Sequence, residues 1–216
     1  MAVILARGGS KEIPLKNIMK VSGRPLISYT IGASIMAGLE TWVSTDNKDI
    51  AYIAKDYGAK VLIRPDEISK DTSKSEDALL HFADNILFDN LVFIQPTSPL
   101  LKSHHIEDGL KMLDSYDSVF SGYKQHWIPE WIMDKSFQSE FTPYKWDIFN
   151  RYRRQDTGFK YIENGAFYIT SRDNLITSKC RYSGNIGCYE MNYSDSFQLD
   201  SWDDLKIIEA LLERYR

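Results

Sequence analysis

The most constraining feature of this sequence is the alternation, along its first half, of short apolar runs with amphipathic segments. Apolar runs at 3–6, 42–46, 60–63 and 91–94 have the length of buried strands, and apolar residues recur at helical spacing between them. Strands that alternate with helices are typical of βαβ units, which build parallel sheets. The pattern therefore predicts an α/β fold with a Rossmann-like, mostly parallel sheet.

Cap residues indicate where the helices begin and end. Proline suits a first helical turn, so Pro25 predicts a helix that runs to Leu39. Asp46 or Asn47 caps a helix over 50–57, which Gly58 closes. Further helices are predicted at 73–87, 105–113 and 201–215, and further strands at 118–121, 165–170, 186–191 and 196–199.

The segment from residue 125 to residue 163 breaks this pattern. It is rich in aromatic and charged residues but has no clear periodicity, and exposed aromatic residues at this density usually form an interface. We therefore predict a single domain over 1–216, in which 125–163 form a small protruding segment that packs on another subunit or covers the binding site.

Composition argues against several classes of protein. The 216 residues carry a net charge of −4, whereas a nucleic-acid-binding protein usually has a basic surplus. No window contains the roughly 18 apolar residues that span a bilayer. The two cysteines, Cys180 and Cys188, fit neither a disulfide scaffold nor a metal motif. Because the first residues also lack the pattern of a signal peptide, we expect a cytoplasmic protein that binds neither nucleic acid nor membranes.

A basic loop with two glycines follows the first predicted strand directly. Ligands of open α/β sheets bind beyond the carboxyl ends of the strands, and Gly8 and Gly9 let backbone amides approach a polyphosphate. Arg7, Lys11 and Lys16 would supply three positive charges to a triphosphate. The loop matches neither the Walker A pattern nor GxGxxG. Taken alone, it therefore leaves a solvated basic turn open as an alternative.

Further motifs accompany this loop in a fixed order. The loop itself lies in the string AVILARGGSKEIPLKNI, which spans 2–18. The motifs that follow are Ser44-Thr45-Asp46, Arg64-Pro65 with Lys70-Asp71-Thr72-Ser73-Lys74-Ser75, Gln95-Pro96-Thr97-Ser98-Pro99-Leu100, Arg153-Arg154-Gln155-Asp156, Glu163-Asn164-Gly165-Ala166-Phe167-Tyr168, and Asp200 with Asp204-Leu205. Over nearly the whole chain, this series resembles the signature of the CMP-sialic acid synthetases, also called acylneuraminate cytidylyltransferases. The related KDO cytidylyltransferases would instead show a loop of the PARxxSxRLPGK kind.

The resemblance implies a sheet of the nucleotide-diphospho-sugar transferase type and an enzyme that transfers CMP. The donor would be CTP, the acceptor a nonulosonic acid (an acidic nine-carbon sugar of the sialic acid type), and the second product pyrophosphate. It implies a homodimer, in which the partner helps to complete the acceptor site. Catalysis would depend on Lys16, Arg7 and Asp200, with Lys16 stabilising charge near the α-phosphate and the leaving group. The implied nucleotide-binding residues are Leu5, Arg7, Gly8, Gly9, Ser10, Lys16, Asn17, Arg64 and Ser75.

On the sugar side, the resemblance implies a second group of residues. They are Gln95, Thr97, Ser98, Arg154, Gln155 and Asn164. Arginine holds a carboxylate with two parallel hydrogen bonds, so Arg154 is the natural partner of the sugar's carboxylate. The arginines at 151–154 also fit a solvated run of charge, and this alternative stays open.

The chain departs from the family pattern where a metal would bind. The reaction calls for Mg²⁺ (or Mn²⁺) to bridge phosphate oxygens. The family places two aspartates two residues apart at this point. Here the second is Asp200, whereas Gln198 replaces the first and contributes a carbonyl oxygen but no charge. Ile162, where several bacterial relatives have arginine, leaves the identity of the sugar open, and Leu101-Lys102 follows Pro-Leu where arginine is common.

No histidine has a catalytic setting in the sequence, so no base for the sugar hydroxyl is identified. Activation of the hydroxyl by a metal at Asp200 would be consistent with the motifs. Two alternatives remain. One is the same fold acting on another nucleotide or sugar, for example GTP with a legionaminic-type acid. The other is a non-catalytic nucleotide-binding protein in which Gln198 marks a lost metal site, and this version predicts that Gln198→Asp gains activity.

Overall fold

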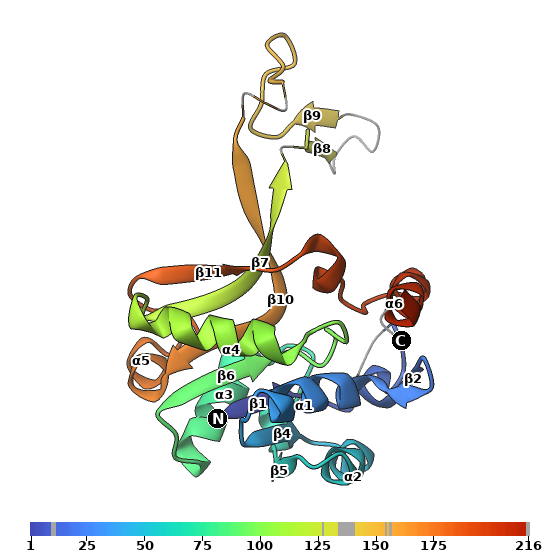
Figure 1. The fold of residues 1–216 in the computed structure, drawn as a ribbon, viewed down its shortest axis with the longest axis vertical. Helices are drawn as coiled ribbons and strands as arrows, with labels where there is room; N and C mark the ends of the chain where they lie inside the picture. The colour runs from blue at the N-terminus through green and yellow to red at the C-terminus, as the bar shows by residue number, and fades with distance from the viewer. Residues whose placement is uncertain (10–11, 127, 134–140, 154, 156, 215–216) are drawn as a thin grey trace. The chain divides into compact units, whose positions relative to one another are not determined.

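The computed structural model describes residues 1–9, 12–126, 128–133, 141–153, 155 and 157–214. The chain divides into two compact units (Figure 1). Unit 1 comprises Met1–Tyr123 together with Glu163–Arg216, and unit 2 comprises Lys124–Ile162. Unit 2 contains most of the aromatic segment for which the sequence predicts an excursion from the sheet. Within the described residues, no helix combines the length and the apolar character that crossing a bilayer requires.

In the described part of the chain, unit 1 is built on a seven-stranded sheet of order β11-β7-β10-β6-β1-β4-β5. Its strands are β1 (Ala2–Leu5), β4 (Thr41–Thr45), β5 (Lys60–Ile63), β6 (Asn90–Ile94), β7 (Ser118–His126), β10 (Phe159–Ser171) and β11 (Ile186–Glu190). β1 pairs in parallel with β4 and β6, β4 with β5, and β7 with β11, whereas β10 runs antiparallel to β6. The sheet is mostly parallel, which confirms the predicted fold class.

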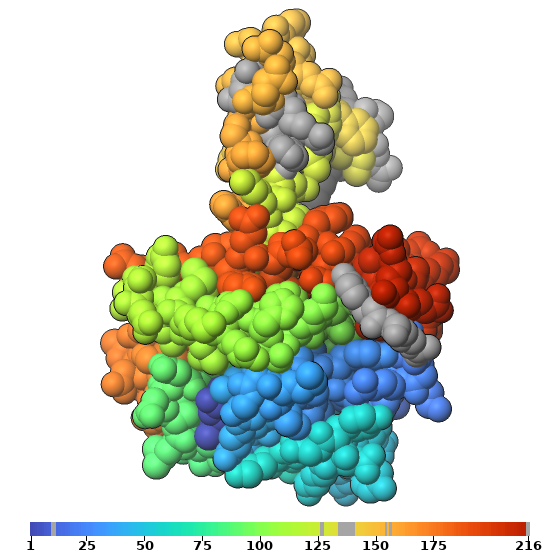
Figure 2. Space-filling view, in the orientation of Figure 1, coloured from blue at the N-terminus to red at the C-terminus, as the bar shows by residue number. Residues whose placement is uncertain are grey.

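Helices cover both faces of this sheet. They are α1 (Leu26–Met36), α2 (Lys48–Asp56), α3 (Ser75–Asn85), α4 (Ser103–Lys111), α5 (Arg172–Ser178) and α6 (Trp202–Arg214). α1, α2 and α4 contribute to one buried cluster, and α3 and α5 to another. Figure 2 shows α2, α1 and α4 following one another across one face of unit 1. α6 packs its buried Ile208 in a third cluster, together with Leu26 and Leu199.

Short elements complete the described chain. The 3-10 helices are η1 (Lys16–Ile18), η2 (Asp66–Ile68), η3 (Met112–Asp114) and η5 (Tyr193–Ser196). Two antiparallel strand pairs lie outside the main sheet: β2 (Lys20–Val21) with β3 (Arg24–Pro25), and β8 (Trp131–Met133) with β9 (Phe141–Pro143). β8 and β9 belong to unit 2.

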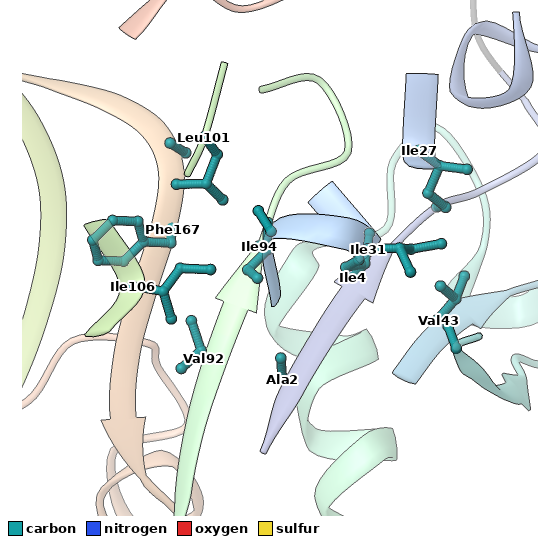
Figure 3. Close-up of a cluster of buried hydrophobic side chains, with 14 of the residues drawn as sticks. Ala2, Ile4, Ile27, Ile31, Val43, Val92, Ile94, Leu101, Ile106 and Phe167 are labelled. Atoms are coloured by element: carbon teal, nitrogen blue, oxygen red, sulfur yellow. The ribbon is translucent and has the colours of Figure 1, made fainter. Parts of the chain in front are cut away.

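The core follows the two-residue period of the strands. On β6, Val92 and Ile94 join the cluster beneath α1 and α4, whereas Leu91 and Phe93 join the cluster beneath α3. Ala2, Ile4 and Phe167 lie in the first of these clusters (Figure 3). Because both faces are buried, β1 is apolar at every position and β6 at every position after Asn90, which is why these strands stand out in the sequence.

Local signals place most element ends to within a few residues. Asn47 caps α2, since its Oδ1 accepts hydrogen bonds from the amides of Asp49 at 2.9 Å and Ile50 at 3.0 Å. The predicted strand at 196–199 is wrong. That region contains η5 and then an extended segment that bonds to the chain after β6, with Leu199 N donating to Thr97 O at 2.8 Å. One isolated hydrogen bond does not form a β-ladder, so the short apolar pattern at 196–199 does not correspond to a strand.

Candidate active site

The loop after β1 lies against the loop after β4. The Gly8 amide donates a hydrogen bond to Asp46 Oδ1 at 2.9 Å. A Cβ atom at Gly8 would lie 2.8 Å from Asn47 Nδ2 and 2.9 Å from Asn47 Cβ. Position 8 therefore requires glycine, because the two loops approach too closely for a side chain. Gly9, in contrast, has open space where a Cβ would point.

Lys16 and Asn17 lie in η1 and connect this loop to the carboxyl-terminal part of the chain. Asn17 is buried, and its Nδ2 donates to the Arg7 carbonyl oxygen at 2.9 Å. Lys16 Nζ lies 2.9 Å from Asp200 Oδ1, although 184 residues separate the two in sequence. The structure therefore brings two predicted catalytic residues, Lys16 and Asp200, into direct contact, next to the segment that carries the third, Arg7.

A cavity of about 330 Å³ opens in unit 1 beside this loop, close to the carboxyl ends of β1 and β6. Its lining residues come from the loop after β1, from η1, from the segment between β5 and α3, and from the end of β6. They are Leu5, Arg7, Gly9, Lys16, Asn17, Arg64, Ile68, Ser69, Lys70, Asp71, Ser73, Lys74, Ser75, Phe93, Gln95, Pro96 and Thr97. The position agrees with the rule that ligands of α/β sheets bind beyond the carboxyl strand ends.

Most of the predicted nucleotide-binding residues lie on the wall of this cavity. These are Leu5, Arg7, Gly9, Lys16, Asn17, Arg64 and Ser75. Gly8 lies behind the wall in its contact with Asp46, and Ser10 and Lys11 fall outside the described residues.

Arg64 is a nearly buried guanidinium on the cavity wall, with an exposed fraction of 5%. Its backbone N–H donates to Thr45 O at 2.8 Å, and its Nε donates to Ser69 Oγ at 3.0 Å. Burial lowers the pKa of Arg64, and the positive charge of Arg7 adds to this effect, whereas Asp46 opposes it. A buried cation that faces a cavity favours an anionic or π-electron-rich ligand there.

The segment between β5 and α3 supplies charged residues that the sequence analysis did not include in the site. Asp71 Oδ1 lies 2.6 Å from Arg7 Nη1, and Lys70 and Lys74 also line the cavity. The sequence does contain a signal for these residues, because 70–75 form one of the motifs that the chain shares with the family. Sequence alone did not show that its charges turn toward the loop after β1.

The cavity is electropositive although the chain as a whole is acidic. Among its described lining residues, Arg7, Lys16, Arg64, Lys70 and Lys74 are cationic, and Asp71 alone is anionic. The chain's net charge is −4. Clustered charge in a cleft concentrates the field and attracts ligands of opposite sign. The cavity is therefore suited to a polyanion such as a nucleoside triphosphate.

The predicted sugar-binding residues are divided among several places. Gln95 and Thr97 line the cavity, and Ser98 is buried beside them. Gln155 is exposed in unit 2, and Arg154 lies outside the described residues.

Asn164 is a buried hydrogen-bonding centre. Its Oδ1 accepts from Ser121 Oγ at 2.6 Å and from the Ala166 amide at 3.1 Å. Its Nδ2 donates to Ser196 Oγ at 2.9 Å and to Met191 Sδ at 3.2 Å. A carboxamide has two donors and one acceptor oxygen with two lone pairs, so these four bonds use its whole capacity. In this structure, Asn164 holds residues 163–165 of β10 in place, where Gly165 has a positive φ of +68° within the strand.

Gln198 and Asp200, the two residues predicted to hold metal, face different surroundings. The Gln198 Nε2 donates to the Asn164 carbonyl oxygen, whereas the Asp200 side chain is 65% exposed and contacts Lys16. The described residues contain no group of three or more histidine, cysteine, aspartate or glutamate side chains placed to bind a metal ion. Asp204, which follows in α6, accepts from the amides of Asp200 and Ser201 and caps the helix.

A network of hydrogen bonds lies behind the cavity wall, and the sequence motifs did not predict it. The Glu163 carboxylate accepts from the hydroxyl groups of Tyr168 and Tyr182, the latter at 2.6 Å. Arg181 lies over the Tyr168 ring, and its Nε contacts Glu76 Oε1 at 2.7 Å. Burial raises the pKa of both tyrosines, and their bonds to Glu163 raise it further. This network links residues 163–165 of β10 to the first turn of α3, where Ser75 lines the cavity.

His105 belongs to a separate buried cluster on α4. Asp195, which is almost fully buried, lies 3.1 Å from Lys102 Nζ and 3.6 Å from His105 Nε2. Burial, reinforced by His104, lowers the pKa of His105 to about 4, so the ring is neutral at pH 7. This cluster fastens η5 to α4 and thereby sets the position of Ser196, the partner of Asn164.

The chain is similar to known proteins along almost its whole length. The family described as cytidylyltransferase matches residues 1–211. The chain is 38% identical to the N-acylneuraminate cytidylyltransferase of Oncorhynchus mykiss, with 99% of this chain and 50% of that protein covered. It is 36% identical to N-acylneuraminate cytidylyltransferase A of Danio rerio, with 99% and 51% covered. For the N-acylneuraminate cytidylyltransferase of Streptococcus agalactiae serotype III (strain NEM316), the identity is 32%, with 94% and 51% covered. The chain thus spans about half the length of the curated relatives it matches.

Solved structures with the same fold are more distant in sequence. A CMP:2-keto-3-deoxy-manno-octonic acid synthetase complexed with CTP has a TM-score of 0.71 at 18% identity, with 100% of this chain and 98% of that chain covered. The 4-diphosphocytidyl-2C-methyl-D-erythritol synthase of Anaerococcus prevotii has a TM-score of 0.69 at 12% identity, with 99% and 97% covered. At these identities the likeness concerns the fold alone.

Proposed function

Because this chain belongs to the cytidylyltransferase family, we propose that it transfers CMP from CTP to a nonulosonic acid of the sialic acid type and releases pyrophosphate. The observation that carries the proposal is the cationic cavity beyond the carboxyl ends of β1 and β6. The names of the relatives, N-acylneuraminate cytidylyltransferases from fish and from a streptococcus, support the class of acceptor.

We assign the nucleotide to this cavity. Arg7 and Lys16 neutralise the phosphates, the backbone at Gly9 approaches them, and Arg64 lies against the base. A charge–charge contact at about 4 Å is worth roughly 4 kcal/mol at an effective dielectric constant near 20, before the cost of desolvation. Several such contacts stabilise the charge that accumulates on the phosphates as the α-phosphorus is attacked, so catalysis rests mostly on position and electrostatics.

Asp71 and Asp200 give the two phosphate-binding cations a partner before the nucleotide arrives. Arg7 contacts Asp71 at 2.6 Å and Lys16 contacts Asp200 at 2.9 Å. Both carboxylates are partly exposed. We therefore propose that the triphosphate takes over these contacts when it binds, because its oxygens carry more charge than one carboxylate.

Asp200 also fits a site for Mg²⁺ or Mn²⁺. Mg²⁺ is usually held by one or two carboxylates and completes its coordination with phosphate oxygens and water. A single, well-exposed carboxylate beside Lys16 meets that requirement. When bound, the ion would neutralise phosphate charge and favour departure of pyrophosphate.

The acceptor sugar is proposed to lie beside the end of β6. Gln95 and Thr97 face the cavity and offer hydrogen bonds to hydroxyl or carboxylate groups. Asn164 would act by holding residues 163–165 of β10, since its own side chain is fully bonded. Contacts from Arg154 and Gln155 to the sugar's carboxylate and hydroxyls stay a prediction from the family resemblance.

We further propose that unit 2 pairs with a second copy of the chain. Its described residues expose large apolar side chains at high density, among them Trp131, Phe141, Phe149 and Phe159, with Phe149 93% exposed. A surface of this kind in a small unit is typical of an interface. Light scattering should give the mass of a dimer, and Phe149→Ser combined with Phe141→Ser should shift it toward the monomer.

The free cysteines Cys180 and Cys188 suit a reducing compartment, in line with the predicted cytoplasmic location.

The direct test measures pyrophosphate release from CTP and Mg²⁺ with sialic, legionaminic, pseudaminic and KDN-type acids. We expect release that depends on one or more of these sugars and that Lys16→Met reduces strongly. Absence of sugar-dependent release with every acid would contradict the proposal. Thermal shift with CTP and GTP distinguishes the alternative nucleotide, because only the preferred one should stabilise the protein at low concentration.

A further inference from the structure

Gln198 makes contacts that neither the reaction nor a metal site accounts for. Its Nε2 donates to the Asn164 carbonyl oxygen and lies 3.3 Å from Ser98 Oγ and 3.4 Å from Gln95 Oε1. The bond to Asn164 is the principal one, and the two longer contacts are weaker. All three neighbours offer oxygen atoms to the same amide nitrogen, so this pocket is built for an N–H donor.

The backbone opposite Gln198 is shaped to admit this side chain. Gly165 adopts φ +68°, in the left-handed region, and a Cβ there would overlap the Gln198 amide nitrogen and come within 3.1 Å of Gln95 Oε1. Glycine at position 165 and glutamine at position 198 are therefore fitted to each other. The absence of a side chain at Gly165 leaves the space that the carboxamide fills.

The other side of this part of β10 is fixed independently. The Asn164 side chain is bonded to Ser121, Ser196 and Met191, which fixes the residue from the β7 and η5 side. Its carbonyl oxygen is left facing Gln198. A buried carbonyl without a donor costs on the order of 1–3 kcal/mol, so residues 163–165 of β10 and the segment at 198–200 hold each other in place.

The contact also orients Gln95. Gln95 lines the cavity, and its Oε1 lies 3.4 Å from Gln198 Nε2. A donor at position 198 therefore favours the arrangement in which the Gln95 oxygen is turned toward Gln198 and the Gln95 nitrogen is available to a ligand. A carboxylate or a hydroxyl oxygen would suit that donor.

We propose that Gln198 is a positioning residue for the acceptor site: it holds residues 163–165 of β10 and orients the Gln95 carboxamide, and it does not bind metal. The inference rests on the proposed function only for the identity of the ligand. A carboxylate at position 198 would place negative charge against the Asn164 carbonyl, Ser98 and Gln95. The same change that would strengthen a metal site therefore breaks this arrangement.

The experiment compares Gln198→Glu, which keeps the size but exchanges the donor for an acceptor, with Gln198→Met, which removes the donor without adding charge. Asn85→Asp, an amide-to-carboxylate change at the exposed carboxyl end of α3, is the matched control. We expect both substitutions at 198 to raise the sugar KM about tenfold, as loss of a buried hydrogen bond implies, while the KM for CTP and the dependence on Mg²⁺ concentration stay near wild type. Calorimetric binding of CTP shows that each variant is folded.

A second readout does not require turnover. Hydrogen–deuterium exchange of a peptide covering 163–167 should become faster in both variants, because this part of β10 loses its donor, and should be unchanged in Asn85→Asp. Unchanged sugar KM and unchanged exchange would overturn the proposal. A rise in kcat or a lower Mg²⁺ requirement in Gln198→Glu would overturn it as well, since that is the behaviour of a metal ligand. If the wild type acts on no sugar, the proposed function fails while the exchange data still decide this inference.

Discussion

Replacing Lys16 with methionine removes one charge from the cavity while keeping the length of the side chain. The side chain is only 16% exposed and its ammonium contacts Asp200 at 2.9 Å, so its field is screened less than that of a surface lysine. A phosphate oxygen at about 4 Å would gain roughly 4 kcal/mol from it at an effective dielectric constant near 20. Desolvation and competition from Asp200 reduce this gain, and we take about 2–3 kcal/mol as the net loss, which corresponds to about 30- to 150-fold in kcat/KM.

Stability should change little in the same variant. The Asp200 partner is 65% exposed, and an ion pair of that kind contributes about 0–1 kcal/mol. For a chain of this size the melting temperature should therefore fall by no more than about 4 °C. A large loss of activity with a small loss of stability is the expected signature of a residue that acts on the ligand.

The assay is steady-state pyrophosphate release with CTP varied at saturating sugar. Lys20→Met is the matched control, since Lys20 is exposed on β2 and does not line the cavity; it should behave as wild type. Lys16→Arg keeps the charge and should retain more activity than Lys16→Met. A Lys16→Met enzyme whose kcat/KM for CTP stays within about threefold of wild type, a change of less than about 0.7 kcal/mol, would refute the electrostatic reasoning.

Three further changes test the fold and its charges. Gly8→Ala should lower the unfolding free energy by about 1–3 kcal/mol, because its Cβ would meet an asparagine side chain at 2.8 Å, whereas Gly9→Ala meets nothing; thermal unfolding compares the two. Burial alone would raise the pKa of Glu76, but Arg181 outweighs it and lowers that pKa below 4.5. The contact between Glu76 and Arg181 therefore stabilises the fold above pH 4.5, and this contribution is lost as the pH falls. Urea unfolding should show that Arg181→Met lowers the free energy of unfolding more at pH 7 than near pH 4. Burial lowers the pKa of His105 from 6.5 to about 4. As the pH drops from 6.5 toward 4, the unfolded chain therefore binds a proton at this residue before the folded chain does, and the free energy of unfolding falls. His105→Gln should make this fall smaller.

The sequence predicted the elements whose signals are local. β5 was placed at its observed bounds, and the Asn47 cap places α2 because one side chain satisfies two amides of the first turn. α1 begins at Leu26, one residue after Pro25, since proline sets the helical entry but its own ψ stays extended. α5 was missed, because its seven residues carry a cap, Ser171, but too short an apolar pattern to predict.

The candidate site was predicted in part. The loop after β1, Lys16, Asn17, Arg64 and Gln95 could be named because their motifs resemble those of a family, and they meet in one cavity. Asp71 belongs to one of these motifs, but its contact with Arg7 depends on how the segment after β5 folds toward the loop after β1. Glu163 belongs to another motif, yet no spacing rule predicts that the hydroxyl groups of Tyr168 and Tyr182 both bond to its carboxylate.

The sequence by itself determined the kind of fold and the chemistry available to it, because apolar period, caps and glycine positions act through neighbours along the chain. The tertiary structure decided which charges meet. Lys16 and Asp200 are 184 residues apart in sequence and lie 2.9 Å apart in space, and Gln198, in the segment after η5, faces Gly165 on β10. Such contacts depend on the packing of whole elements, and the energies that set it are sums over many residues rather than properties of any short segment.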